Sequence, residues 1–277
     1  MLLALAVLFF AAADGVALYR HRQFAAAEAE LRRVLANKPG DAQSRLYLAR
    51  TLLELGRVPE ALAEIDRALA GQTDPEIQFE AGNIVRDLAE QRFADLKRLA
   101  PDSAAVRELD ARHYEQQGNL PEALREYRAA IAREPGRPGL HYEVGNILWR
   151  MRQLEAAGEE LQAELARSPR HGMANLRLGQ VFVAGNETTK AVAFLEQAVD
   201  AMPESTEARR ELGKAYQKLG RLADARRQWE AVAEARPDDD QIHYLLGNLY
   251  RRMGLEDRGR EELNRHREIL QRRQKRP

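Results

Sequence analysis

The sequence predicts an all-α protein in which helical hairpins repeat and stack into a solenoid. Glycine recurs every 34 residues, at Gly145, Gly179, Gly213 and Gly247. Alanine and proline recur at the same interval, at Ala123, Ala157, Ala191 and Ala225 and at Pro101, Pro135, Pro169, Pro203 and Pro237. A fixed period of this length is typical of repeat proteins in which each unit is one supersecondary element.

The clearest unit spans residues 206–239 and predicts two short helices closed by Pro237, which cannot continue a helix. Gly213 in the first helix and Ala225 in the second are small where the two helices would come closest. This pattern, with Leu-Gly and Tyr followed by Ala, an aromatic residue and Pro, resembles the tetratricopeptide (TPR) repeat. The resemblance covers nearly the whole chain and implies a right-handed superhelical solenoid of about eight TPR-like repeats that share one core.

The predicted solenoid covers residues 14–255, and a capping helix with a basic tail follows over residues 256–277. A polar outer face on the last helix is what the end of a solenoid requires. The expected repeats, in chain order, span about 14–41, 42–75, 76–103, 104–137, 138–171, 172–205, 206–239 and 240–273.

The third repeat departs from the pattern. Gly82 fits the first helix, and Ala89 and Phe93 fit the second, but only seven residues separate Gly82 from Ala89 instead of twelve. The residues of the turn between the two helices are therefore missing. We expect residues 76–100 to form a single long helix or a tight hairpin, with a bend or a change of pitch in the superhelix.

Residues 1–13 are almost wholly apolar and end in three alanines. Such a run is typical of a secretory signal peptide cleaved after Ala13, which predicts a periplasmic or secreted protein. No Lys or Arg precedes the run, and two alternatives remain open. Because Gly15 stands where the first-helix glycine of a repeat belongs, residues 8–21 would form a packed helix of a cytoplasmic protein. The run would otherwise be an uncleaved membrane anchor, although it is shorter than the roughly 20 apolar residues that span a bilayer.

Composition and motifs argue against several classes of function. The formal net charge is zero, which does not point to nucleic acid or to an anionic membrane surface. Cysteine is absent, which excludes disulfides, thiolate zinc sites and cysteine nucleophiles. The sequence has no phosphate-binding glycine loop, no nucleophile elbow and no metal-ligand spacing among its six histidines. We therefore predict a protein that is not an enzyme and that has no cofactor and no metal site.

Two histidines are expected to be structural. His141 and His243 both occupy the fourth position of a repeat, where a large residue packs. Asp110 and His113 lie three residues apart on one predicted helix face, like a carboxylate–histidine metal pair, but no second pair completes a site. A solvated helix surface is the expectation there.

The TPR resemblance implies that the first helices line a concave groove, with the second, fifth, ninth, twelfth and thirteenth positions of each repeat facing it. In repeat five these positions give Tyr142, Asn146, Trp149 and Arg150. Repeat seven gives Arg210, Lys214, Gln217 and Lys218, and repeat eight gives Tyr244, Asn248, Arg251 and Arg252. Repeat four gives Glu108, Arg112 and Glu115, so the basic character is confined to the C-terminal part of the groove.

Cations and amides beside aromatic side chains are typical of binding hot spots for an extended peptide. We therefore expect a scaffold for protein–protein interaction that binds a protein or peptide with acidic groups, and that meets a membrane only if residues 1–13 remain uncleaved. Two alternatives stay open: an exported or membrane-tethered accessory factor for bacterial envelope assembly or secretion, and a subunit that presents substrate to a separate enzyme.

Overall fold

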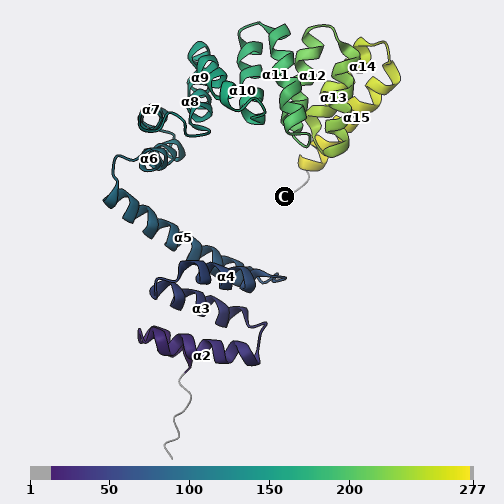
Figure 1. The fold of residues 1–277 in the computed structure, drawn as a ribbon. Helices are drawn as coiled ribbons and strands as arrows, with labels where there is room; N and C mark the ends of the chain where they lie inside the picture. Colours follow the sequence, from purple (N-terminus) through teal and green to yellow (C-terminus); the bar gives the residue numbers. More distant parts are fainter. Residues whose placement is uncertain (1–13, 275–277) are drawn as a thin grey trace, which may run out of the picture. The chain divides into compact units, whose positions relative to one another are not determined.

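A computed structural model describes residues 14–274 of the chain. Within these residues every assigned element is an α-helix, which confirms the all-α prediction (Figure 1). The helices are α1 (Gly15–Arg20), α2 (Phe24–Asn37), α3 (Ala42–Glu54), α4 (Val58–Leu69), α5 (Pro75–Leu99), α6 (Ala104–Gln116), α7 (Leu120–Arg133), α8 (Leu140–Arg150), α9 (Leu154–Arg167), α10 (Gly172–Ala184), α11 (Thr188–Ala201), α12 (Thr206–Lys218), α13 (Leu222–Ala235), α14 (Asp240–Arg252) and α15 (Glu256–Gln274).

The chain divides into two compact units, which we call unit 1 (residues up to Leu99) and unit 2 (residues from Ala100). Among the described residues, unit 1 has one buried apolar cluster and unit 2 has two. Unit 1 holds the hairpins α1–α2 and α3–α4 together with α5. Unit 2 holds the five hairpins α6–α7, α8–α9, α10–α11, α12–α13 and α14–α15.

The same local signals recur in successive hairpins. The side chains of the residues before α3, α6, α10, α12 and α14 accept a backbone N–H of the first turn: Asp41, Ser103, His171, Ser205 and Asp239. These caps satisfy donors that have no partner within the helix. Between the two helices of a hairpin one residue takes a positive φ, at Gly56, Gly118, Gly220 and Gly254 and at the non-glycine residues Arg22, Arg152 and Asn186.

Small residues stand where the two helices of a hairpin meet, as the repeat pattern predicts. A Cβ added to Gly213 would overlap the ring of Trp229, and one added to Gly145 would lie 2.7 Å from Cγ of Leu161. Ala225 is fully buried. The same close approach joins Gly179 to Leu195 and Gly247 to Leu263.

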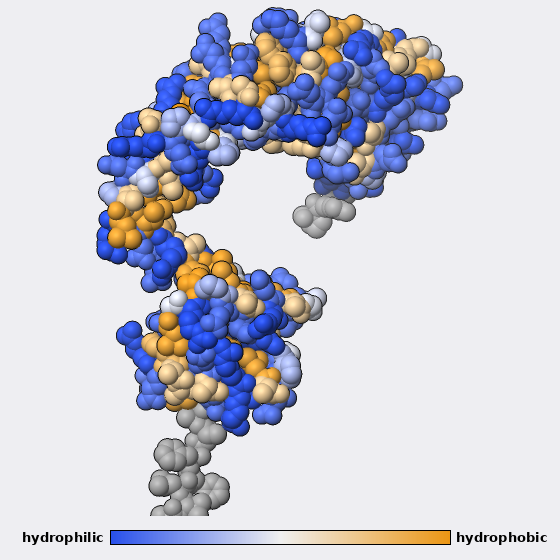
Figure 2. Space-filling model, in the orientation of Figure 1, coloured by the Kyte–Doolittle hydropathy of each residue, from blue (hydrophilic) through white to orange (hydrophobic). Residues whose placement is uncertain are grey.

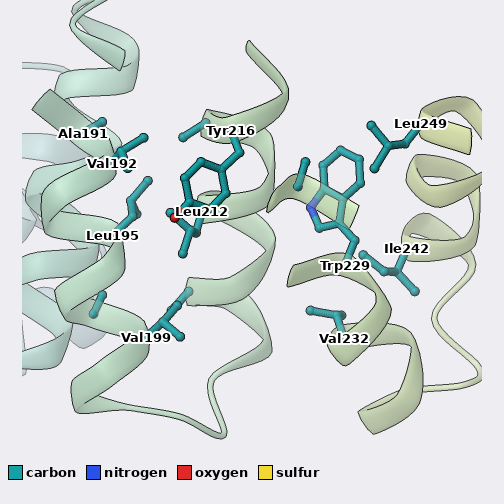
Figure 3. Packing of buried hydrophobic residues seen from close by; sticks show 14 of the residues in the cluster. Ala191, Val192, Leu195, Val199, Leu212, Tyr216, Trp229, Val232, Ile242 and Leu249 are labelled. Atoms are coloured by element: carbon teal, nitrogen blue, oxygen red, sulfur yellow. The ribbon is translucent and has the colours of Figure 1, made fainter. Parts of the chain in front are cut away.

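The core of unit 2 consists of two buried clusters, one from α6 to α10 and one from α10 to α14, which both draw residues from α10. Figure 3 shows one stretch of it, where Leu195 of α11 and Leu212 of α12 face each other, and Trp229 of α13 faces Ile242 and Leu249 of α14. Since each hairpin buries its apolar face only against its neighbours, the stability of the unit is a sum of repeat and interface contributions. The visible surface outside these contacts is largely hydrophilic (Figure 2).

A polar contact joins the two helices of many hairpins at a spacing of 19 residues. Arg45 donates to Glu64 at 2.7 Å, and Arg107 donates to Glu126 at 2.8 Å. His141 Nδ1 lies 2.7 Å from Glu160 Oε2, and His243 Nδ1 lies 2.5 Å from Glu262 Oε2. The second ring nitrogen of His243 lies 2.9 Å from the carbonyl oxygen of Pro237, so the buried ring also fixes the end of the preceding repeat.

The third repeat is a single helix, α5, of 25 residues. Of the two structures expected there, the long helix is confirmed and the tight hairpin is wrong. The physical reason is the missing turn, because nothing in the sequence interrupts the helix between Gly82 and Ala89.

The first described residues belong to the repeat pattern. Gly15 is buried in α1, and a Cβ on it would lie 2.8 Å from Cγ of Leu31 in α2. The signal peptide and the membrane anchor concern residues 1–13, which lie outside the described residues. The packed helix is expected over residues 8–21, of which residues 14–21 are described, and Gly15–Arg20 of these form α1. Among the described helices, none is both long and apolar enough to span a bilayer.

Candidate partner-binding site

The predicted groove residues lie on α8, α12 and α14, the first helices of repeats five, seven and eight. We call this surface of unit 2 the first-helix face. Its exposed members are Arg150, Lys214, Lys218, Tyr244, Arg251 and Arg252, and its partly exposed members are Tyr142, Asn146, Trp149, Arg210, Gln217 and Asn248.

The α8 residues are engaged with neighbouring repeats. Arg150 Nη1 donates to Glu115 Oε1 of α6 at 2.5 Å. The ring of Trp149 lies under the guanidinium of Arg177 of α10, with 4.2 Å from Cζ to the ring centroid. The ring centroids of Tyr142 and His171 are 4.9 Å apart. These side chains therefore tie repeat five to repeats four and six as well as lining the surface.

On α12 the cations differ in their partners. Arg210 forms an ion pair with Asp239, the residue that caps α14. Lys214 Nζ donates to Glu211 of its own helix at 2.8 Å, and Lys218 Nζ donates to Asn186 Oδ1 of the preceding repeat at 3.0 Å. Of these three cations Arg210 is partly buried, whereas Lys214 and Lys218 are exposed. The two lysines are therefore the more accessible charges.

On α14 the site includes an exposed aromatic side chain, that of Tyr244. Tyr244 is 51% exposed, and its ring centroid lies 5.5 Å from that of His266 in α15. Asn248 uses its amide within the helix, where Nδ2 donates to the carbonyl oxygen of Tyr244 at 2.9 Å. Arg251 lies 3.7 Å from Glu256, and both side chains are more than half exposed.

Because of these partners, fewer cations are accessible to another molecule than the sequence predicts. Arg150 is neutralised by Glu115 of the preceding repeat, and Arg210 by Asp239 at the end of its own repeat. The exposed lysine and arginine pairs of repeats seven and eight contribute little to stability, since ion pairs in water contribute about 0–1 kcal/mol. A carboxylate of a partner can therefore replace Glu211 or Glu256 at little cost. We call the remaining accessible group the C-terminal cationic patch, which consists of Lys214, Lys218, Tyr244, Arg251 and Arg252.

At the other end of the first-helix face carboxylates are paired with arginines: Glu108 with Arg112 and Arg137, and Glu115 with Arg150. Burial raises the pKa of Glu143, the nearby carboxylates of Glu115 and Glu108 raise it further, and Arg112 opposes them. Sequence reasoning missed Glu143 and Arg177, which both occupy the sixth position of a repeat and border the predicted set. Their position in the repeat, directly after the predicted fifth position, could have indicated that they border the surface.

Asn146 is less available for binding a partner than its place among the predicted groove residues implies. Its Oδ1 atom is buried and has no hydrogen-bond partner among the described residues. A donor from a partner would have to displace neighbouring side chains to reach this oxygen. The accessible contacts of the surface are therefore its charged and aromatic groups.

The histidines predicted to be structural are structural. His243 is buried between Glu262 and the carbonyl oxygen of Pro237, and His141 is paired with Glu160. In the described part of the chain no cluster of three or more His, Cys, Asp or Glu side chains could hold a metal ion.

Comparisons with known proteins agree with this architecture. One tetratricopeptide repeat model matches residues 13–76, 79–138 and 142–206, and a second matches residues 182–249. Among curated proteins, none matches the chain in sequence.

Several solved structures share the fold. MamA 41-end from Desulfovibrio magneticus RS-1 is 23% identical, with a TM-score of 0.59 over 63% of this chain and 97% of that chain. Another MamA structure is 19% identical, with a TM-score of 0.57 over 60% of this chain and 96% of that chain. YrrB, described as a TPR protein with an unusual peptide-binding site, is 23% identical, with a TM-score of 0.57 over 64% of this chain and 91% of that chain.

Proposed function

Because this chain belongs to the tetratricopeptide repeat family, we propose that it is a non-enzymatic scaffold that binds a protein or peptide on the first-helix face of unit 2. The observation that carries the proposal is the C-terminal cationic patch. Tyr244 and four cations are exposed on the first helices of two successive repeats, α12 and α14. The peptide-binding site of the structurally similar YrrB supports the same class of function.

The chemistry of the patch favours an extended segment with carboxylates flanking an apolar side chain. Lys214, Lys218, Arg251 and Arg252 supply charge-assisted hydrogen-bond donors, which bind carboxylates more strongly than neutral donors do. Tyr244 supplies an aromatic surface with a polar tip, as binding hot spots commonly do. At repeats four and five the arginines are already paired with Glu108 and Glu115, so the partner is expected to bind at repeats seven and eight.

Binding of synthetic peptides tests this proposal. The probes are two sets of fluorescent peptides, one rich in Glu and Asp around a single Phe and one with Lys in place of the acidic residues. We expect fluorescence anisotropy to show binding of the acidic set, weakening with added salt because exposed charges are screened. Equal binding of both sets would contradict the proposed chemistry.

Charge reversal locates the binding. The variant with Lys214, Lys218, Arg251 and Arg252 all replaced by Glu should lose binding of the acidic peptides and keep its helical circular dichroism. The matched control replaces four exposed cations of second helices by Glu: Arg133, Lys190, Arg227 and Arg260. Retained binding by the first variant, or equal loss in both, would place the partner elsewhere.

The apolar run at residues 1–13 supports a second proposal, that the protein is exported or tethered to a membrane and acts as an accessory factor there. The intact mass of the protein from separated fractions of its own cells tests it. A chain that begins at Asp14 outside the cytoplasm, or a full chain in the membrane fraction, agrees with the proposal. A full-length chain in the soluble cytosol contradicts it.

A further inference from the structure

In most hairpins the first-helix glycine is covered by a side chain of the second helix. The covering residue lies 16 positions later, as Leu31 over Gly15, Leu161 over Gly145, Leu195 over Gly179, Trp229 over Gly213 and Leu263 over Gly247. Gly82 of α5 is the exception. It is exposed, and among the described residues no atom of another element lies within 4 Å of the Cβ position it would have.

The residue that fits this role in the third repeat is Phe93, and it cannot reach Gly82 in its own chain. Both residues lie on the continuous helix α5, and eleven residues of helix separate their Cα atoms by about 16 Å along the axis. Phe93 is partly exposed, and no residue of α5 after Ile84 is buried. The second half of α5 therefore has the sequence pattern of a second helix without the hairpin that would bury it.

The neighbouring helix α4 shows the corresponding gap. α4 and α7 begin with the same Pro-Glu-Ala-Leu segment, which aligns Leu62 with Leu124. Leu62 is 39% exposed, whereas Leu124 is 8% exposed. Leu69, at the end of α4, is 36% exposed. Apolar side chains that the next hairpin covers in unit 2 thus stay open to solvent in unit 1.

Helix lengths explain this exposure. α3 and α4 have 13 and 12 residues, about 20 Å each, whereas the 25 residues of α5 extend about 37 Å. Only the first half of α5 can pack on α3 and α4, as its buried residues Ile77, Ala81 and Ile84 show. Hydrophobic residues are visible along α5 on the face shown in Figure 2.

The two halves of α5 also carry opposite charge. Residues 75–90 contain four acidic residues and one basic residue, a formal charge of −3. Residues 91–99 contain three basic residues and one acidic residue, a formal charge of +2. An antiparallel pair of identical α5 helices with residue 82 opposite residue 93 places residues 76–84 of each copy, which include Glu76 and Glu80, beside the basic residues 91–99 of the other, whereas a parallel pair places like charges together.

We propose that two copies of this chain associate through antiparallel α5 helices, with Phe93 of each copy covering Gly82 of the other. The second half of α5 from one copy then serves as the missing second helix of the other copy's third repeat. The covering contact is reciprocal, as a two-fold symmetric interface requires. This association goes beyond the proposed function and does not depend on it, because it uses α5 of unit 1, whereas the C-terminal cationic patch lies on α12 and α14 of unit 2.

Disulfide trapping in the full chain tests the register, since the native chain contains no cysteine. The variants Gly82→Cys and Phe93→Cys are purified separately, mixed and oxidised. We expect a covalent dimer that contains one copy of each variant, and intact mass identifies it. Each variant carries a single cysteine, so every disulfide formed joins two chains. The matched control mixes Gly82→Cys with Gln91→Cys, whose side chain lies on the other side of α5, and should give much less of the mixed dimer.

A second variant tests whether the contact drives association. Gly82→Leu fills the space that Phe93 of the second copy would take, and nothing within the described chain opposes the new side chain. We expect sedimentation equilibrium to show a dimer for the wild type and a dissociation constant raised at least about tenfold for Gly82→Leu, with unchanged helical circular dichroism. The control Gly136→Leu, at another glycine with open space around it, should dimerise like the wild type.

Three outcomes would overturn the proposal. A wild-type chain that stays monomeric at the highest soluble concentration does not use α5 for self-association, and the exposed face then belongs to a different protein. A dimer that gives no more 82–93 disulfide than the control pair associates in another register. A Gly82→Leu variant that dimerises as tightly as the wild type does not bury Gly82.

Discussion

His243 and Glu262 form a buried pair, with Nδ1 of the ring 2.5 Å from Oε2 of the carboxylate. The other ring nitrogen faces the carbonyl oxygen of Pro237 at 2.9 Å, so one side chain joins the two helices of a hairpin and the end of the preceding repeat. Arg45 makes the corresponding contacts with Glu64 and Pro39. The fourth position of a repeat is thus a polar link between hairpins.

Replacing His243 by Leu should destabilise unit 2 by about 3 kcal/mol, because it leaves the carboxylate of Glu262 buried without its main partner. His243→Arg should retain most of the stability, since arginine makes this contact in other repeats. The midpoint of urea unfolding, followed by circular dichroism, measures both. Equal midpoints for His243→Leu and the wild type would show that the pair is not a structural link.

Gly179→Ala should lower stability by about 1–3 kcal/mol, since its Cβ would lie 2.6 Å from Cγ of Leu195 in a packed core. Gly158→Ala is the matched control within a neighbouring helix. Its Cβ would meet Val181 Cγ1 at 3.7 Å, an ordinary contact, so the gain in helix propensity should raise stability by up to about 1 kcal/mol. Melting temperatures that change in the same direction for both variants would contradict this account of hairpin packing.

Glu143, which is partly buried, and Glu126, which is buried, should give opposite pH dependence of stability. The pKa of Glu143 is raised by burial and by nearby carboxylates, so its ionisation destabilises the folded state and the full penalty is present above the folded-state pKa. Glu143→Gln should therefore stabilise the protein at neutral pH, and the gain should shrink as the pH falls through that pKa.

Glu126 is the counterpart. Burial alone would raise its pKa, but hydrogen bonds from Arg107 and Arg125 outweigh burial and lower it. Its contribution to stability is therefore present above the unfolded-state pKa and is lost as the pH falls through the folded-state value. Glu126→Gln should destabilise at neutral pH and have little effect in acid. Melting temperatures measured from neutral to acidic pH check both signs, and parallel curves for the two variants would contradict them.

Arg152→Gly should stabilise the α8–α9 hairpin by about 0.5–1 kcal/mol. Arg152 has a φ of 64°, a left-handed backbone that glycine adopts without strain, although glycine gives back part of the gain as unfolded-state entropy. Asn186→Gly should gain less, because asparagine tolerates this backbone better than arginine does. Thermal unfolding ranks the two variants, and a larger gain for Asn186→Gly would contradict the explanation.

Much of the fold follows from the sequence because its determinants recur at one spacing. Gly213 and Ala225 predict the close approach of two helices, and the structure has that approach with Trp229 over the glycine. The structure of the third repeat is harder to predict, because the loss of the turn residues allows either a long helix or a tight hairpin. The choice between the two depends on how the segment packs on neighbouring helices, which the spacing of Gly82 and Ala89 does not show.

The candidate site could be predicted only in part. The positions of Tyr244 and Lys218 follow from the repeat, but the partner of Arg150 lies 35 residues away in the preceding repeat and that of Arg210 lies 29 residues away at the end of its own repeat. A signal for such pairs exists, since Glu108 and Arg137 are also 29 residues apart and form an ion pair. The repeat register alone does not show which cations stay accessible.

The most direct test of the proposed binding surface is to map where an acidic peptide contacts the protein. A peptide of the acidic set carrying a photoreactive phenylalanine analogue is irradiated in the presence of the full chain, and the labelled residues are identified by mass spectrometry. The account predicts labels on α12 and α14, around Tyr244. Labels confined to the second helices α13 and α15, or spread evenly along the chain, would contradict it.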